Sequence, residues 1–134
     1  MIKNKYLKYR LNGLEYRVTF CSNKDAPDIL QDLSRLFSDK KMLLVVDKKI
    51  NKKIINSLLK KLKQSDFDIT LFKVDGSKKN KNNKFLFSII DKLIEKKFSK
   101  RSVILSCGGG VVGDVCALAS SLYLRGLIYL HIPT

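Results

Sequence analysis

Two kinds of hydrophobic pattern follow one another along this chain, one typical of strands and the other typical of helices. Short, largely apolar runs occur at 41–47 (KMLLVVD), 67–75 (FDITLFKVD), 102–107 (SVILSC) and 127–132 (LIYLHI). Such runs are typical of parallel strands that are buried on both faces. An earlier segment, 15–21 (EYRVTFC), alternates apolar and polar residues and also predicts a strand.

Segments with helical spacing separate these strands. Apolar stripes predict helices over 51–64, over 85–94 and from Asp25 or the Ala26–Pro27 pair to Phe37, and 111–124 predicts a helix rich in small residues. The order from residue 41 onward is therefore β-α-β-α-β-α-β. This order predicts an α/β fold with a parallel, Rossmann-like sheet and helices on both faces.

The chain is short enough to form one domain. It has 134 residues, within the roughly 100–200 that a domain usually needs, so we assign residues 1–134 to one domain. The last predicted strand delivers Pro133 and Thr134 to the ligand edge of the sheet, where another loop should begin, so we expect the sequence to be truncated there.

Cysteine usage and hydropathy indicate the compartment. Cys21, Cys107 and Cys116 lack CxxC spacing and predict reduced, mostly buried thiols. No signal peptide is recognisable, and no uncharged run approaches the ~20 residues of a membrane span. We expect a soluble, cytoplasmic protein without a membrane partner.

The net charge of +15 invites a nucleic-acid interpretation, which the distribution of charge weakens. Of the 27 basic residues, 22 are lysines and only 5 are arginines. Proteins that read base edges favour arginine over lysine. Residues 102–134 contain one basic and one acidic residue, Arg125 and Asp114. A solvated lysine surface is the favoured interpretation, ahead of attraction of phosphorylated metabolites and of nucleic-acid binding.

The segment CGGGVVGD, residues 107–114, lies between a predicted strand and a predicted helix. Glycines there let the backbone approach a phosphate, and the following helix N-terminus offers free N–H groups and a positive dipole end. A tight turn packed on the sheet is the alternative. Four glycines in six positions are more than a turn needs, so we expect contact with a phosphate or a dinucleotide.

The spacing is nevertheless unlike the ordinary Rossmann fingerprint, in which an acid roughly 20 residues downstream binds the ribose. No acid follows Asp114 in this sequence, whereas Asp47 and Asp75 end earlier predicted strands. The ribose partner is therefore expected upstream of the glycines. Asp114 itself is expected in the first helical turn, where it could stabilise the helix dipole or bind a ribose or nicotinamide group.

The pieces GGGVVGD, SLYLRG and IPT, in this order and separation, resemble the 3-dehydroquinate synthase family of sugar phosphate cyclases. The resemblance is strong over 101–134 and weaker over 41–80. It implies the N-terminal, NAD-binding domain of that fold, without the family's C-terminal helical domain. Iron-containing alcohol and glycerol dehydrogenases are related to the same family and remain an alternative, as does another cyclase.

The resemblance also implies roles for individual residues. Asp47 would hold the adenosine ribose, Asp114 would bind near the nicotinamide ribose, and Thr134 would touch the cofactor. Arg125 would help to bind substrate phosphate across a homodimer interface, although an arginine there could equally cap a helix. The pyrophosphate would lie on Gly109, Gly110, Val111, Val112 and Gly113.

One loop departs from the family pattern Asp-Gly-Glu-x-x-Lys. Asp75 and Gly76 match and would contact the cofactor, but Ser77 replaces the glutamate and Asn80 the lysine, with Lys79 and Lys81 adjacent. The residues of the usual ribose contact are therefore changed here, and a cyclase with another substrate becomes an alternative.

The implied reaction converts a seven-carbon keto-acid phosphate to 3-dehydroquinate with loss of phosphate, in the shikimate pathway of aromatic amino-acid biosynthesis. It uses NAD and a divalent metal, zinc or cobalt. The metal needs about three protein ligands, but His131 is the only histidine and falls in a strand predicted to be buried. We therefore expect no metal site and no catalytic residue in this chain, which alone would be inactive. A lysine-rich, non-enzymatic binding domain remains a third hypothesis.

Overall fold

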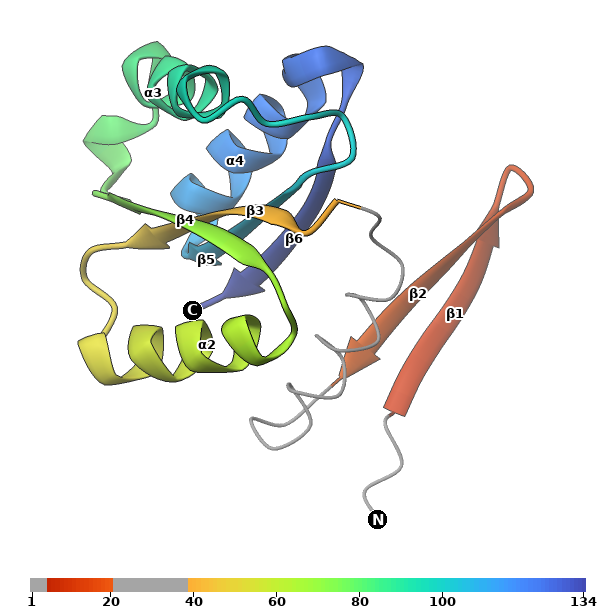
Figure 1. Cartoon of the computed structure of the whole chain (residues 1–134). Coiled ribbons are helices and arrows are strands. Elements are labelled where there is room, and N and C mark those ends of the chain that lie inside the picture. Colours follow the sequence, from red (N-terminus) through yellow and green to blue (C-terminus); the bar gives the residue numbers. More distant parts are fainter. Residues whose placement is uncertain (1–4, 21–38) are drawn as a thin grey trace.

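The computed structural model describes residues 5–20 and 39–134 (Figure 1). The helix predicted from residue 25 to residue 37 and Cys21 lie outside these residues. The strands of the hairpin and of the main sheet are β1 (Lys5–Leu11), β2 (Leu14–Phe20), β3 (Lys41–Asp47), β4 (Asp68–Val74), β5 (Val103–Gly108) and β6 (Ile128–Pro133). The helices are α2 (Lys52–Gln64), α3 (Asn83–Glu95) and α4 (Gly110–Leu122).

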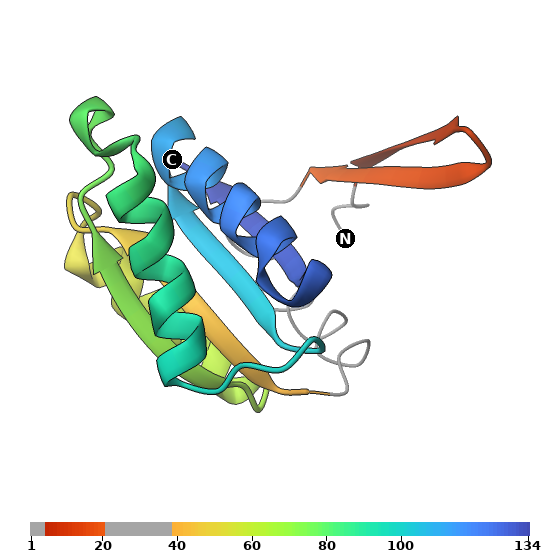
Figure 2. The same cartoon turned by 90° about the horizontal axis from the view of Figure 1, so that it is seen from above.

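The main sheet has four parallel strands in the order β4-β3-β5-β6. The chain runs from β3 to β4 on one side and then places β5 on the other side of β3. Figures 1 and 2 show α2 on one face of this sheet and α3 with α4 on the other. The prediction of a parallel sheet with helices on both faces is thus confirmed.

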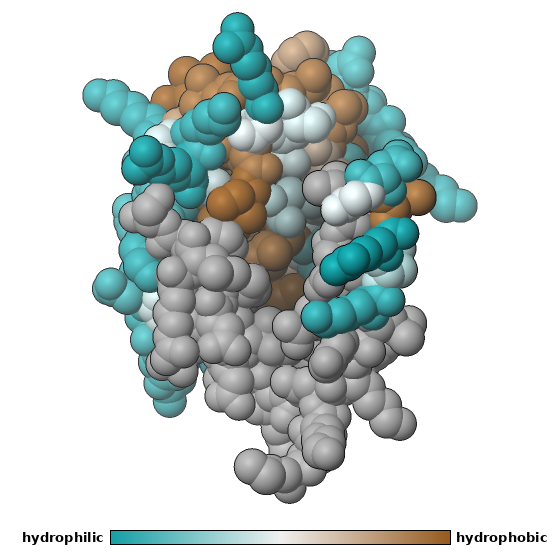
Figure 3. All heavy atoms as spheres, turned by 90° about the vertical axis from the view of Figure 1, so that its right-hand side faces the viewer, coloured by the Kyte–Doolittle hydropathy of each residue, from teal (hydrophilic) through white to brown (hydrophobic). Residues whose placement is uncertain are grey.

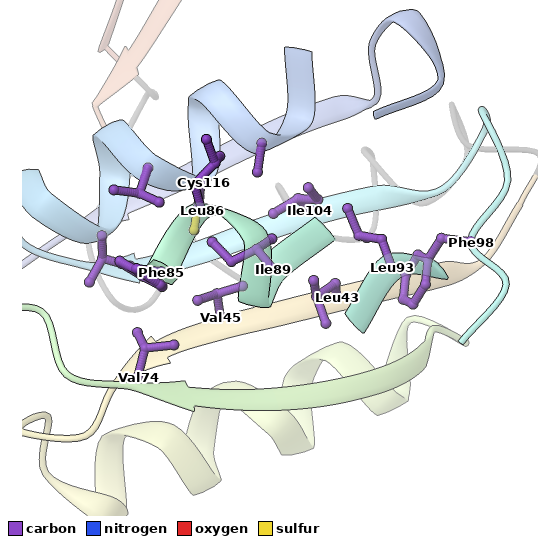
Figure 4. Close-up of a cluster of buried hydrophobic side chains, with 13 residues drawn as sticks. Leu43, Val45, Val74, Phe85, Leu86, Ile89, Leu93, Phe98, Ile104 and Cys116 are labelled. Carbon is purple, nitrogen blue, oxygen red and sulfur yellow. The ribbon is translucent and has the colours of Figure 1, made fainter. Parts of the chain in front are cut away.

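The strand β3 supplies the centre of the core because both of its faces are covered. Leu43 and Val45 point toward α3 and α4, and Met42, Leu44 and Val46 belong to a second cluster together with Ile55 and Leu62 of α2. All five β3 side chains are completely buried. Figure 4 shows side chains of α3 lying over β3 and β5. Burial of each such side chain stabilises the fold by about 1.5–3 kcal/mol.

The N-terminal strands form a separate antiparallel hairpin, which the sequence predicted only in part. The segment predicted at 15–21 is β2, and β1 was not predicted. Asn12 and Gly13 connect the two strands with φ values of 50° and 80°. A two-residue hairpin turn of type I′ needs positive φ at both positions, which Asn-Gly adopts readily.

The helix α4 ends at Leu122, two residues earlier than predicted, and continues as a short 3₁₀ turn over Tyr123–Arg125. Leu124 and Arg125 have left-handed backbones, with φ of 49° and 66°. Apolar side chains are exposed from the second half of α4 into β6, namely Leu118, Leu122, Leu124 and Ile128. Figure 3 shows apolar residues interspersed with hydrophilic ones on this side of the molecule.

Two of the three predicted buried thiols can be located. Cys107 at the end of β5 and Cys116 in α4 are buried and form no disulfide. Burial raises the pKa of the Cys107 thiol, and it raises the pKa of Cys116 to about 12. Among the helices of the described residues, none is long and apolar enough to cross a membrane.

Candidate functional site

The predicted site residues gather where the parallel strands end. Asp47 closes β3, Gly76 follows β4, and Gly108 closes β5. Thr134 follows β6, and its backbone N–H donates to the Gly108 carbonyl at 3.2 Å. Since β3 and β5 are neighbours whose connections leave in opposite directions, their carboxyl ends form the crevice in which open α/β sheets bind ligands.

The glycines at this edge fall into two groups. A side chain at Gly76 would place its Cβ 2.3 Å from Asp47 Oδ2 and 2.8 Å from a methyl of Val112, and one at Gly108 would lie 3.0 Å from Val112. At Gly109 and Gly110 such a Cβ would have no described atom within 4 Å apart from the chain neighbours and the helix backbone, and both glycines are exposed. Close packing thus explains why Gly76 and Gly108 have no side chain. Gly109 and Gly110 instead leave open space in front of the backbone.

The open glycines begin helix α4. Gly109 is its N-cap, and the first helical bond runs from Gly113 N–H to the Gly109 carbonyl at 3.0 Å. A glycine cap has no side chain to bond the first N–H groups of the helix, which lack intrahelical partners. Gly110 therefore lies where backbone donors and the positive end of the helix dipole can receive an anion.

Val111 and Val112 contribute to this turn in different ways. Val112 is completely buried and touches the positions of Gly76 and Gly108. Val111 is half-buried and packs against the core cluster below α4. Their side chains hold the turn on the sheet, so any ligand contact at these two residues is made by their backbone.

Asp47 presents a carboxylate to the crevice. Its Oδ1 accepts a hydrogen bond from the Lys49 backbone N–H at 3.0 Å, which fixes the side chain. Its Oδ2 faces Gly76 and accepts no hydrogen bond from the described residues. The fixed carboxylate with a free oxygen suits a vicinal diol, because it can accept from sugar hydroxyls.

Asp75, by contrast, is engaged both by its own loop after β4 and by the loop after β3. Its Oδ1 accepts from the Ser77 backbone N–H at 3.0 Å, and its Oδ2 lies 3.1 Å from the ammonium of Lys48. The side-chain amide of Asn80 donates to the Asp75 carbonyl at 3.0 Å and to the Ser77 hydroxyl at 3.3 Å. Ser77 and Asn80, which replace the expected glutamate and lysine, therefore bond to each other and close the loop.

The Lys48 ammonium and the Ser77 N–H lower the pKa of Asp75 from 3.8 to about 2. The folded state thus holds the charged carboxylate more strongly than the unfolded chain does. This contribution to stability is complete above pH 3.8 and disappears as the pH falls toward about 2.

We expect Lys48→Met to lower the free energy of unfolding above pH 3.8 but not near pH 2, as measured by urea unfolding at several pH values. Lys49→Met, the control, should not produce this pH-dependent difference.

Asp114 lies one residue further into the helix than predicted. Because α4 begins at Gly110, Asp114 is its fifth residue, and the first turn contains no acid. The interpretation as a stabiliser of the helix dipole in the first turn is therefore wrong. Its carboxylate is exposed and lies 2.7 Å from the ammonium of Lys81, so this pair connects the loop after β4 to α4 beside the open glycines.

Two predicted residues occupy other surroundings. Arg125 precedes β6, whereas the site lies at its far end, about 20 Å away along six strand residues. The arginine is exposed and is not brought to the crevice. His131 was expected in a buried strand, but β6 is an edge strand of the described sheet and His131 is exposed.

Sequence reasoning missed the partners that fix these carboxylates. Lys48 directly follows Asp47, yet in a chain with 22 lysines its position gives no sign that it pairs with Asp75. Sequence reasoning also left Gly108 out of the site, although its place in the glycine run could have identified it as a residue at this edge of the sheet. Residues 8–13 and 39–134, whose side chains are described, contain no group of three or more His, Cys, Asp or Glu residues placed to hold a metal ion.

Comparisons with known proteins agree with this geometry. A family profile described as "3-dehydroquinate synthase N-terminal" matches residues 71–134. A 3-dehydroquinate synthase of Clostridium acetobutylicum is 36% identical over 130 residues, which are 97% of this chain and 36% of that relative. One of Pelagibacter ubique is 35% identical, over 96% of this chain and 34% of the relative. The chain thus spans about a third of the length of these relatives.

Solved structures show the same fold. A 2-deoxy-scyllo-inosose synthase complexed with carbaglucose-6-phosphate, NAD⁺ and Co²⁺ superposes with a TM-score of 0.79 at 15% identity, over 97% of this chain and 35% of that one. The 2-epi-5-epi-valiolone synthase of Streptomyces hygroscopicus subsp. jinggangensis, with NAD⁺ and Zn²⁺ bound, gives a TM-score of 0.68 at 25% identity, over 93% and 35%.

Proposed function

The chain belongs to the 3-dehydroquinate synthase family, and from this premise we propose that it is the NAD-binding part of a lyase that converts a seven-carbon keto-acid phosphate to 3-dehydroquinate. The enzyme releases phosphate and acts in the shikimate pathway in the cytoplasm. The observation that carries the proposal is the uncapped start of α4 at Gly109 and Gly110, open to a ligand and next to the Asp47 carboxylate.

The residues at the crevice fit a dinucleotide. The backbone from Gly109 to Val112 would receive the pyrophosphate at the positive end of α4. Asp47 Oδ2 would accept from the adenosine ribose hydroxyls, and Thr134 lies beside Gly108 at the same edge. Asp75 and Gly76 would act chiefly by supporting Asp47, because the carboxylate of Asp75 is already paired. When bound, NAD supplies a reversible hydride acceptor.

The substrate side of the proposal reaches beyond this chain. We propose that a divalent metal, zinc or cobalt, is held by residues that this sequence does not contain, so no step through the metal is derived. Arg125 would bind substrate phosphate in a homodimer. Its exposed side chain leaves the guanidinium accessible to a phosphate.

A second candidate is another sugar phosphate cyclase. It is favoured by the self-contained Ser77–Asn80 contact, which replaces two residues of the usual family pattern. A substrate panel distinguishes the two. The protein encoded by the whole gene should release inorganic phosphate from the seven-carbon keto-acid phosphate, and release only from hexose or heptulose phosphates would support the second candidate.

Cofactor binding is tested on the chain itself. Calorimetric titration with NAD should give one site per chain, with ADP-ribose competing. Absence of binding by a folded chain would contradict the proposal.

Lys81 is expected to assist this binding by neutralising Asp114. Lys81→Met leaves an unpaired carboxylate beside the phosphate site, so we expect NAD affinity to fall about three- to tenfold at low salt. Stability should change little, because an exposed ion pair contributes about 0–1 kcal/mol. Lys79→Met in the same loop is the control. In an Asp114→Asn background the Lys81 substitution should have a smaller effect, and equal effects in both backgrounds would refute the coupling.

A further inference from the structure

Three polar side chains that the proposed function does not use lie beneath the first turns of α4. Ser106 of β5 is completely buried. Its Oγ lies 2.8 Å from the Tyr129 hydroxyl and 2.7 Å from Nδ1 of His131, both on β6. The Tyr129 hydroxyl donates to the Gly113 carbonyl at 2.8 Å. The network therefore connects two strands to the helix that carries the open glycines.

The chemistry of these groups gives the network a direction. The Gly113 carbonyl can only accept, so Tyr129 directs its single proton to it. The Tyr129 oxygen can then only accept from Ser106, whose single proton points toward it. Ser106 Oγ must in turn accept from His131, and Nδ1 of the ring carries the proton. Burial raises the pKa of Tyr129, which keeps the phenol protonated as this chain of bonds requires.

The packing around His131 supports this arrangement. A Cβ at Gly113 would lie 3.0 Å from both Cε1 and Nε2 of the ring, so the imidazole lies directly against the glycine. The ring also stacks on Tyr129, with centroids 6.4 Å apart and an interplanar angle of 19°. Gly113 thus lacks a side chain because of His131. From the sequence, Gly113 was expected to contact the phosphate, whereas the structure explains the glycine by its contact with the His131 ring.

We propose that Ser106, Tyr129 and His131 are positioning residues, which fix neutral His131 as its Nδ1–H tautomer and hold the start of α4 in place for the pyrophosphate. The bond from Tyr129 to Gly113 attaches the helix to β6. The Nε2 lone pair of His131 remains available as an acceptor. The role in pyrophosphate binding rests on the proposed function, whereas the tautomer does not depend on it.

The tautomer can be measured directly, because His131 is the only histidine. A long-range ¹H–¹⁵N spectrum at pH about 8.5, about two units above the ordinary histidine pKa, should show a protonated Nδ1 and an unprotonated Nε2. In Tyr129→Phe the Ser106 proton is free to turn to the ring, so the Nε2–H form should appear. Ser106→Ala should have the same effect. Tyr123→Phe, which removes another hydroxyl that bonds a backbone carbonyl, should not.

The positioning role is tested by NAD titration of the same variants. Tyr129→Phe should weaken binding about two- to tenfold, the usual worth of one hydrogen bond, and Tyr123→Phe should not. His131→Asn, whose amide can donate to Ser106, should bind NAD better than His131→Leu.

An Nε2–H tautomer in the wild type would overturn the directed network of hydrogen bonds. Unchanged NAD affinity in Tyr129→Phe would overturn the positioning role. Failure of the wild-type chain to bind NAD would overturn the proposed function and with it the positioning role, while the spectrum still decides the tautomer.

Discussion

Gly110→Val should abolish NAD binding without unfolding the chain. Apart from the chain neighbours and the backbone of the helix itself, no atom of the described residues lies within 4 Å of a Cβ at this position, so the valine Cβ has room. It would instead occupy the space in front of the first N–H groups of α4. Loss of two charge-assisted hydrogen bonds to phosphate corresponds to roughly 100-fold or more in affinity. Calorimetry measures the affinity, and thermal unfolding without ligand measures the stability.

The control for this substitution is Leu118→Val, which places a β-branched residue on the exposed side of the same helix. It should leave NAD affinity unchanged. If Gly110→Val binds NAD as the wild type does, the pyrophosphate does not lie on this turn. If it lowers the melting temperature strongly, open space does not explain the glycine.

Gly76→Ala should damage both stability and binding, through two different neighbours. The new methyl would lie 2.8 Å from Val112, which is completely buried and cannot move away, and overpacking of this kind costs about 1–3 kcal/mol. It would also lie 2.3 Å from Asp47 Oδ2, whose carboxylate must rotate out of the crevice. We therefore expect urea unfolding to show a lower stability and calorimetry to show weaker NAD binding.

The two causes can be separated by second substitutions. Val112→Ala removes the buried clash, so it should destabilise the Gly76→Ala protein less than it destabilises the wild type. It should not restore NAD binding, because Asp47 remains displaced. Additive stability effects of the two substitutions would show that Gly76 and Val112 are not in the tight contact described here.

Residue pattern alone sufficed to predict the main sheet, because four short apolar runs separated by helical stripes have one simple arrangement. It also placed Asp47 and the glycine run at the same edge, since parallel strands end together. The hairpin was predicted only in its second strand. The missed signal is Asn12–Gly13, a pair that favours a two-residue turn and indicates a strand on each side.

The remaining differences have tertiary causes. The pattern of β6 cannot show that it lies at an edge of the sheet, so the exposure of His131 was not predicted. The start of α4 differs from the prediction by one residue, because a glycine N-cap leaves no polar side chain to mark the helix boundary. The choice of Lys48 and Lys81 as partners of Asp75 and Asp114 depends on the folded loop, and no local feature separates them from the other lysines.

The convergence of all four strand ends on one crevice has a consequence for the life of the chain in a cell. No single segment contains the crevice, so an unfolded or partly folded chain has nothing with which to capture the dinucleotide. A ligand that binds only the native state raises its stability by about 2.7 kcal/mol when its free concentration is 100 times the dissociation constant. The supply of NAD would then act as a folding aid, and a shortage of cofactor would shorten the lifetime of the protein by exposing it to proteases.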